Sequence, residues 1–279
     1  MSEADSNSRD SYWSGLVSRY LAVPPPLRPQ SAEFEQYFRL AASCLDGVTQ
    51  GQFGSVLVLG ATPEFYHHFK KNSHSVMALD KSQAMLETLW PGAESEYVVG
   101  DWVEAKLGGP LFDLALCDGG LSLLEYPGEL QRFAQVMCKR LAPGGLLVSR
   151  VFLPERTCTA LEQVLDDLHQ GEVCSASLLK VRLWMALAAK SDGCVTLHDV
   201  WSAYDNAVEC KDTLRDVAGW GDADFDSMAS YQGLHTNYFF PDENALKSGF
   251  QELAGFSSIQ FEQSAAYPDL PIKLMVASR

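Results

Sequence analysis

Two aspartates stand just after short apolar runs of the chain, and their positions suit the recognition of a nucleoside. Asp80 follows Leu79 about twenty residues after Gly60, and a carboxylate placed there accepts hydrogen bonds from both hydroxyls of a ribose. Asp101 can accept a hydrogen bond from an adenine amino group, and Trp102 beside it offers a flat apolar face to the ring. These residue types at this spacing predict a nucleoside site. For Asp80 the alternative is a helix N-cap before residues 82–89.

The loop after the first apolar run, 56–59, keeps only the first glycine of a dinucleotide-binding loop. Its sequence is Gly60-Ala61-Thr62-Pro63-Glu64, and Gly60 allows a ligand to approach the backbone closely. Thr62 stands where the second glycine of that pattern would be, and the nearby Glu64 carboxylate would repel a pyrophosphate. The loop therefore argues against NAD or FAD and favours a ligand without phosphates.

A third aspartate, Asp118, follows the apolar run 112–117 and precedes Gly119 and Gly120. This pattern places a carboxylate and a flexible turn at the centre of the same crevice. Asp118 can act as a base beside a bound substrate, and the alternative is that it only caps the following turn.

These ordered motifs resemble those of the class I S-adenosylmethionine (SAM)-dependent methyltransferases. The similar segments are 59–64, 79–85, 99–102, 112–120 and 141–145, and the first loop resembles a subgroup with Gly-x-Thr-Pro-Glu in place of the commoner Gly-x-Gly-x-Gly. The resemblance implies that the first segment holds the amino-acid part of SAM, the second the ribose and the third the adenine. The implied cofactor-binding residues are Gly60, Ala61, Thr62, Glu64, Asp80, Lys81, Ser82, Met85, Gly100, Asp101, Trp102, Asp118 and Gly119.

The resemblance also implies methyl transfer to a small-molecule acceptor by in-line displacement, in which the protein aligns the acceptor and excludes water. Asp118 could orient the ammonium group of the methionine part of SAM, or it could be the general base beside the acceptor. His198 and His235 are further candidates, although a lone histidine is more often a packing or surface residue. The predicted acceptor-binding residues are Tyr12, Trp13, Tyr20, Arg28 and Tyr238. Three alternatives stay open: a SAM-binding protein with other chemistry or a regulatory role; a nucleotide-dependent oxidoreductase, which is less favoured; and a purely structural or partner-binding role, which would not need the ordered carboxylates after the apolar runs.

The elements that must position these residues follow from the apolar runs. Runs at 56–59, 76–79, 97–99, 112–117 and 146–152, separated by loops or by segments of helical length, predict a parallel sheet covered on both faces. Two closing runs, 257–263 and 273–277, predict an antiparallel hairpin. The expected fold is α/β, with a Rossmann-like, mostly parallel seven-stranded sheet, an antiparallel C-terminal hairpin and a helical cap insertion.

The chain divides into four expected parts. Residues 1–50 form an N-terminal helical lid, 51–152 the SAM-binding core, 153–254 a helical cap with the substrate region, and 255–279 the strands that complete the sheet. The cap is predicted to hold helices at 157–169, 176–190, 196–209 and 241–254. Its segment 220–231 carries three aspartates and is predicted to be a solvated loop rather than a metal site.

Composition narrows the class of partner. The formal net charge of -15 disfavours binding to nucleic acid and to anionic membranes, because both carry negative charge. The 21 Lys and Arg residues are scattered along the sequence and predict no local basic groove. The seven cysteines lack any Cys-x-x-Cys pair and lie mostly in apolar stretches, which is typical of reduced thiols in a cytoplasmic protein. No metal is expected.

Overall fold

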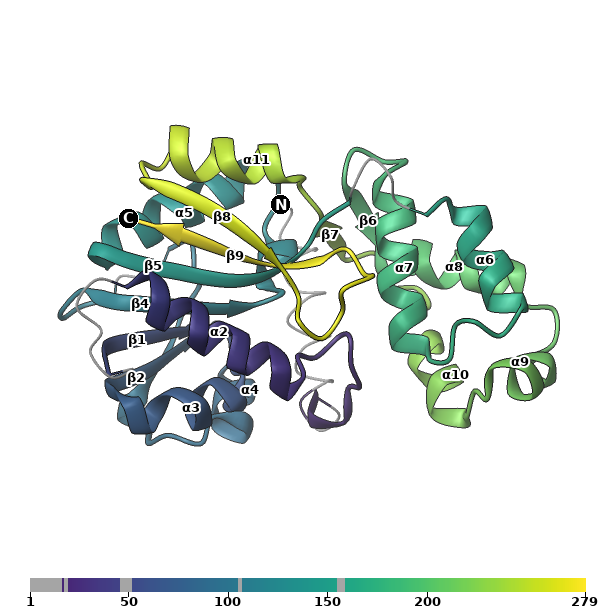
Figure 1. Ribbon diagram of the computed structural model, residues 1–279. Helices are drawn as coiled ribbons and strands as arrows, with labels where there is room; N and C mark the ends of the chain where they lie inside the picture. The colour runs from purple at the N-terminus through teal and green to yellow at the C-terminus, as the bar shows by residue number, and fades with distance from the viewer. Residues whose placement is uncertain (1–16, 18–19, 46–51, 105–106, 155–158) are drawn as a thin grey trace.

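The computed structural model describes Val17 and residues 20–45, 52–104, 107–154 and 159–279. Its centre is a seven-stranded sheet in the order β3-β2-β1-β4-β5-β9-β8 (Figure 1). The five strands from β3 to β5 run parallel, and β9 and β8 run antiparallel to their neighbours. The strands are β1 (Phe53–Leu59), β2 (Ser73–Asp80), β3 (Tyr97–Val99), β4 (Phe112–Asp118), β5 (Leu141–Phe152), β8 (Ser258–Gln263) and β9 (Ile272–Ser278). The predicted fold class is confirmed.

Helices cover both faces of this sheet. Successive residues of a strand point to opposite faces, so each strand buries side chains under both layers of helices. On β1, Val56 and Val58 are buried with α2, α3 and α4, whereas Leu57 and Leu59 are buried with α5, α11 and the π-helical turn after α11. Burial on both faces is the reason that the strands read as continuous apolar runs. The covering helices are α2 (Ser31–Cys44), α3 (Pro63–Phe69), α4 (Gln83–Leu89), α5 (Gly128–Arg140) and α11 (Glu243–Lys247), which continues into the turn Ser248–Glu252.

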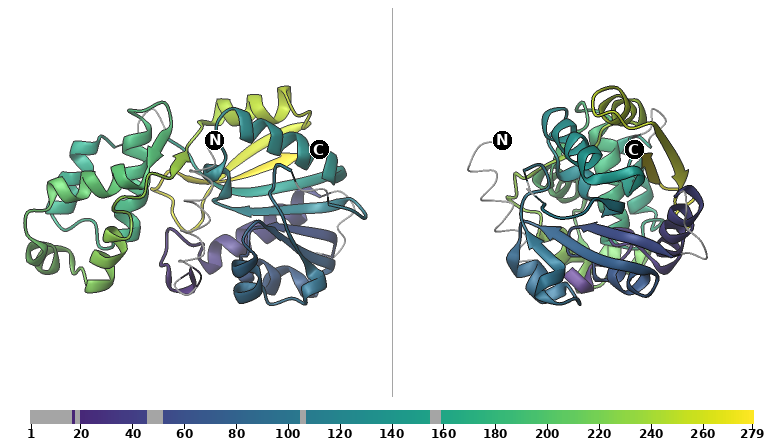
Figure 2. Two further views of the ribbon diagram at one scale, coloured as in Figure 1. Left: turned by 180° about the vertical axis from the view of Figure 1, so that it is seen from behind. Right: turned by 90° about the vertical axis from the view of Figure 1, so that its left-hand side faces the viewer.

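A helical insertion follows β5 and has a core of its own. The chain enters it from the end of β5, so the insertion lies beyond the carboxyl end of that strand (Figures 1 and 2). Trp184 lies at the centre of its apolar cluster, against Phe152, Tyr238 and Phe240. The elements are α6 (Leu161–His169), α7 (Ala176–Ala188), α8 (Leu197–Ala207), α9 (Lys211–Ala218), α10 (Asp222–Ala229) and the antiparallel strands β6 (Cys194–Thr196) and β7 (Asn237–Phe239).

The prediction of a solvated loop at 220–231 is wrong, because this segment contains α10. The Asp224 carboxylate accepts hydrogen bonds from the backbone N–H of Gly221 and of Ala176, at 3.0 and 2.9 Å, which caps the helix and ties it to α7. Asp222 forms an ion pair with Arg215 at 2.5 Å. Two of the three aspartates that suggested a solvated loop, Asp222 and Asp224, therefore lie in the first turn of a helix, and Asp226 lies in its middle.

Residues 241–254, predicted as a helix of the cap, pack on the sheet instead of on the insertion. The ring centres of Phe250 and Phe133 lie 6.3 Å apart, so the π-helical turn packs against α5. We therefore propose to place the end of the insertion near residue 240.

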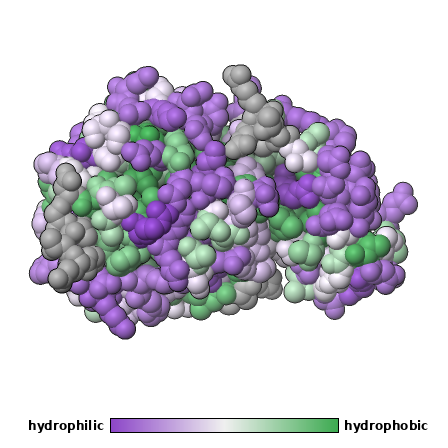
Figure 3. Space-filling view, viewed as in Figure 1, coloured by the Kyte–Doolittle hydropathy of each residue, from purple (hydrophilic) through white to green (hydrophobic). Residues whose placement is uncertain are grey.

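The surface in view is largely hydrophilic. On the face in Figure 3, hydrophobic residues show among the hydrophilic ones. Among the described residues, no helix combines the length and apolarity that a membrane crossing needs, and no group of three or more His, Cys, Asp or Glu could hold a metal. The cysteines that the structure describes are all free.

Candidate functional site

A cavity lies at the carboxyl ends of β1, β2, β3 and β4, on both sides of the point where the strand order reverses between β1 and β4. Open α/β sheets bind their ligands at this place. Its lining residues are Tyr20, Leu59, Gly60, Ala61, Thr62, Asp80, Lys81, Ser82, Met85, Gly100, Asp101, Trp102, Val103, Asp118, Gly120, Leu123, Leu124 and Glu129.

The structure brings together all the predicted cofactor-binding residues except two. Glu64 lies in α3 and does not line the cavity, and Gly119 lies on a separate small apolar pocket behind the turn Gly120–Leu123. Leu123, Leu124 and Glu129 also line the cavity and were not predicted from the sequence. Leu123 and Leu124 come from the end of this turn, and Glu129 comes from the first turn of α5. Nothing in their local sequence marks them as ligand-facing.

The first loop is shaped by Gly60, whose φ of +99° is a left-handed conformation that favours glycine. Its N–H donates to the carbonyl of Leu79 at 2.9 Å, which fixes the loop against the end of β2. A Cβ at Gly60 would lie 3.8 Å from both Asp80 and Trp102, inside the cavity wall. The glycine therefore leaves room for a ligand between the first loop and the next two strand ends.

Asp80 does not cap the helix that follows it. Its Oδ1 accepts a hydrogen bond from the N–H of Ser82 at 2.7 Å, and the Ser82 hydroxyl accepts one from Met85 N–H as the N-cap of α4. The alternative role of Asp80 as N-cap is therefore wrong, and its carboxylate lines the cavity.

Trp102 is held as a wall of the cavity rather than as a mobile surface ring. Its Nε1–H donates to the carbonyl of Leu79 at 2.8 Å, and its ring lies against Gly120, where an added Cβ would come within 2.5 Å of it. Asp101 beside it accepts a hydrogen bond from the N–H of Val103 at 2.9 Å. The indole and the carboxylate are thus fixed at the end of β3.

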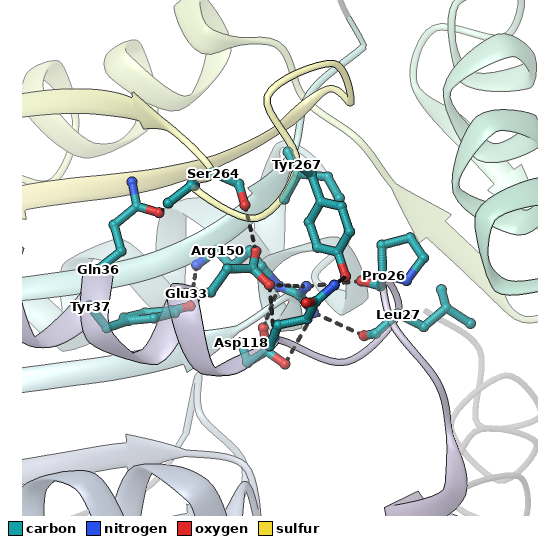
Figure 4. Close-up of polar contacts among 12 residues, drawn as sticks. Pro26, Leu27, Glu33, Gln36, Tyr37, Asp118, Arg150, Ser264 and Tyr267 are labelled. Atoms are coloured by element: carbon teal, nitrogen blue, oxygen red, sulfur yellow. Dashed lines mark hydrogen bonds and ion pairs between the residues drawn. The ribbon is translucent and has the colours of Figure 1, made fainter.

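Asp118 forms a buried ion pair that was not predicted from the sequence. Arg150, at the carboxyl-terminal part of β5, donates from Nε to Oδ1 of Asp118 at 2.6 Å and from an NH2 group to Oδ2 at 3.3 Å (Figure 4). Burial raises the pKa of Asp118, and the Arg150 guanidinium opposes this shift. To act as a general base, Asp118 would have to give up this pairing, and its catalytic role stays a prediction.

The segment before α2 brings one predicted acceptor residue, Tyr20, to the cavity. Burial raises the pKa of Tyr20, the Asp118 carboxylate acts in the same direction, and a side-chain hydrogen bond joins Tyr20 to Thr62. Arg28 lies outside the cavity: it forms an ion pair with Glu64, donates to the Tyr20 carbonyl at 3.0 Å, and lies 4.7 Å from the centre of the Tyr20 ring. The predicted residues Tyr12 and Trp13 lie outside the described residues.

The insertion contributes no described residue to the cavity lining. Tyr238 lies in the insertion core, stacked on Trp184 with ring centres 5.5 Å apart. His198 and His235 lie beside each other on the insertion, with ring centres 4.9 Å apart. Nδ1 of His198 accepts a hydrogen bond from the N–H of Gly233 at 3.1 Å. The structure therefore gives Tyr238 and the two histidines no contact with the cavity.

Comparison with known proteins identifies the fold. No family model and no curated protein sequence matches the chain. Among solved structures, the SAH complex of DhpI matches 100% of this chain and 98% of its own at 14% identity and a TM-score of 0.56. The N-methyltransferase NodS of Bradyrhizobium japonicum, in complex with S-adenosyl-L-homocysteine (SAH), matches 97% of this chain and 98% of its own at 14% identity and a TM-score of 0.50.

The chain has the class I methyltransferase fold. A third similar structure, from Rhodobacter sphaeroides, is provisionally named as a Zn-dependent alcohol dehydrogenase; it matches 98% of each chain at 17% identity and a TM-score of 0.57. Likeness at these identities concerns the fold alone, so function must be argued from the site.

Proposed function

We propose that this protein is a SAM-dependent methyltransferase that acts on a small-molecule acceptor. The observation that carries the proposal is the order of side chains along the edge of the sheet. From β3 to β4 the cavity presents Asp101 with Trp102, then Asp80, then the Gly60 loop, then Asp118. A SAM molecule lying along this edge would place its adenine, ribose and amino-acid parts in the same order.

Charge supports the same ligand. Among the described residues, the lining carries the carboxylates of Asp80, Asp101 and Glu129 and that of Asp118, which Arg150 already neutralises in part, against the ammonium group of Lys81. SAM brings a sulfonium and an ammonium group to such a lining, and a carboxylate-rich cavity stabilises both. Two of the similar structures, those of DhpI and NodS, are complexes with SAH.

The oxidoreductase alternative meets an electrostatic difficulty at the first loop. A dinucleotide places its pyrophosphate at the N-terminus of the helix that follows this loop, which here is α3. The first turn of α3 contains Glu64, whose charge Arg28 offsets in part, and begins with Pro63, which has no N–H to offer a phosphate. The loop before it keeps only Gly60 of the glycine pattern. The first loop of this chain thus gives no support to a dehydrogenase activity like the one in the name of the Rhodobacter sphaeroides protein.

The residues of the cavity fit a role in orientation rather than in covalent chemistry. SAM, when bound, supplies an electrophilic methyl group that an oxygen, nitrogen, carbon or sulfur of the acceptor can attack in line. Asp80 would orient the ribose, Trp102 would cover the adenine, and Tyr20 with Leu123 would exclude water from the amino-acid end. Such fixed alignment lowers the barrier of a displacement without a nucleophile from the enzyme.

The proposal is tested by calorimetric binding of SAH to the full chain. We expect micromolar affinity for the wild type and a loss of about 10- to 100-fold in Asp80→Asn, because the ribose hydroxyls lose a charged acceptor. Gly120→Ala should also weaken binding, since its new Cβ would displace Trp102, whereas Gly128→Ala is a matched control at an open position. NADH serves as the competing ligand.

The binding outcomes separate a SAM-binding protein from a nucleotide-dependent oxidoreductase, and the methylation assay then separates methyl transfer from other SAM chemistry. Binding of SAH that depends on Asp80 and Gly120 supports the methyltransferase proposal, and methylation assays against acceptor libraries would follow. Failure of the wild type to bind SAH, or tighter binding of NADH, would overturn it.

A further inference from the structure

Arg150 uses every N–H group of its buried guanidinium. Besides the two hydrogen bonds to Asp118, one NH1 hydrogen bond goes to the carbonyl of Pro26 at 2.9 Å, and one NH2 hydrogen bond goes to the carbonyl of Leu27 at 2.9 Å. The remaining NH1 group faces Oε2 of Glu33 at 3.5 Å. The Arg150 side chain is 0% exposed, so each of these contacts is made without competition from solvent (Figure 4).

These contacts join two parts of the cavity wall that are far apart in the sequence. Asp118 lines the cavity from the end of β4. The carbonyls of Pro26 and Leu27 belong to the segment 20–28, which we call the strap, and the first residue of the strap, Tyr20, lines the same cavity. A single side chain thus sets the position of a carboxylate and of the backbone that carries an aromatic wall.

The strap is fixed to the first loop as well. Tyr20 shares a side-chain hydrogen bond with Thr62, and Arg28 connects the Tyr20 carbonyl with Glu64 of α3. The strap therefore spans the β1 loop and the β4 end. In the proposed orientation of SAM, these two places surround the amino-acid part of the cofactor and lie away from the adenine and ribose.

We propose that Arg150 is a positioning residue for the amino-acid end of the SAM site, where it holds the Asp118 carboxylate and the Tyr20 wall in register. This role rests on the proposed function. Its physical basis is the fork geometry of arginine, which can hold a carboxylate and two carbonyls at once, whereas a lysine ammonium cannot reproduce five directed donors.

The role predicts a selective change in ligand affinity for Arg150→Lys. Adenosine contains the adenine and ribose of SAH but lacks the amino-acid part. We expect Arg150→Lys to weaken SAH by about 30-fold or more and adenosine by no more than about threefold, measured by calorimetry on the full chain. Arg182→Lys is the matched control: Arg182 pairs with Asp167 in the insertion, lines no part of the cavity, and should leave both ligands unchanged.

A second variant tests whether Arg150 acts through the strap. Tyr20→Ala should show the same selective loss of SAH, and it changes only a partly exposed side chain of the strap, so the test stays decisive if Arg150→Lys does not fold. In a double-mutant cycle, Tyr20→Ala should add little to the loss in Arg150→Lys, because the strap is already displaced.

Three results would overturn the role. Equal losses of SAH and adenosine in Arg150→Lys would show a general effect on folding, and additive losses in the double variant would show that Arg150 and Tyr20 act separately. Unchanged SAH affinity in both single variants would remove the role altogether. If the wild type binds SAH and these variants fail the test, only the positioning role falls; if the wild type does not bind SAH, the proposed function falls with it.

Discussion

At the scale of single residues, two buried cations show contrasting environments. Arg150 is paired with carboxylates, whereas Lys180 in α7 donates to the carbonyl and the hydroxyl of Ser227, both at 2.8 Å, and lies 3.7 Å from the centre of the Tyr231 ring. Neutral partners compensate a buried charge less well than a carboxylate does. Burial lowers the pKa of Lys180 to about 7.

This environment predicts a pH dependence of folding. The unfolded lysine keeps its ordinary pKa of 10.5, while the folded one loses its proton near pH 7, so between these values the unfolded state binds more protons. The free energy of unfolding should therefore rise with pH from about 7 upward, by at most about 1.4 kcal/mol per pH unit. The Tyr231 ring favours the charged form, which acts to raise the pKa of folded Lys180 and so to narrow the pH range over which stability rises.

Urea unfolding of wild type and Lys180→Met between about pH 6 and pH 9 checks this expectation. Lys180→Met should be more stable than the wild type at the lower pH, and its advantage should shrink as the pH rises. Lys190→Met, which changes an exposed lysine just after α7, is the control and should follow the wild type. An identical pH slope in wild type and Lys180→Met would contradict the prediction.

The sequence reveals strand-end residues such as Asp80 and Asp101 because their signal is local: a carboxylate follows a short apolar run. Arg150 also interrupts such a run, at 146–152, and a charged residue inside a buried strand is a signal that could have marked it. Its partners could not be predicted, because Asp118, Glu33 and Pro26 lie 32, 117 and 124 residues away along the chain. Only the folded topology brings them together.

At the scale of elements, the same distinction separates the sheet from the insertion. The strands of the sheet are predictable because burial on both faces makes them apolar throughout. The short strands β6 and β7 depend on each other across about 40 residues of chain, and α9 and α10 have only eight residues each. Their stability comes from packing on Trp184 and its neighbours, which no local pattern shows.

This packing predicts how the insertion responds to truncation of Trp184. Its side chain is 6% exposed and contacts aromatic rings on β5, β7 and the loop after α10, so Trp184→Ala should lower the free energy of unfolding by about 3–5 kcal/mol. Trp184→Phe should cost about 1–2 kcal/mol, because the buried indole N–H has no hydrogen-bond partner among the described residues and its loss leaves no group unpaired.

Chemical denaturation measures both values, and calorimetry on the folded variants provides the functional comparison. Since no described residue of 159–240 lines the cavity, Trp184→Phe should bind SAH within about twofold of the wild type. A loss of affinity beyond about tenfold would show that the insertion takes part in cofactor binding.

At the scale of the whole molecule, charge is the dominant surface property. The chain carries 36 Asp and Glu against 21 Lys and Arg, a formal net charge of -15. Exposed ion pairs such as Lys190 with Glu162 reduce the repulsion among the excess carboxylates only slightly, because such pairs contribute little free energy in water. The folded state therefore experiences net self-repulsion, while the buried contacts of Arg150 are shielded from added salt.

The balance predicts that salt stabilises the protein. Raising NaCl from about 10 to 200 mM near pH 8 shortens the screening length to about 7 Å and weakens the long-range repulsion more than the close pairs. We expect the melting temperature to rise by about 2–4 °C, which corresponds to roughly 1 kcal/mol for a chain of this length. Near pH 5 the carboxylates begin to take up protons, and the same salt step should have a smaller effect. A melting temperature that falls with added salt near pH 8 would mean that attractive ion pairs at the surface outweigh the repulsion. The excess of Asp and Glu would then have to lie away from the elements whose packing stabilises the fold.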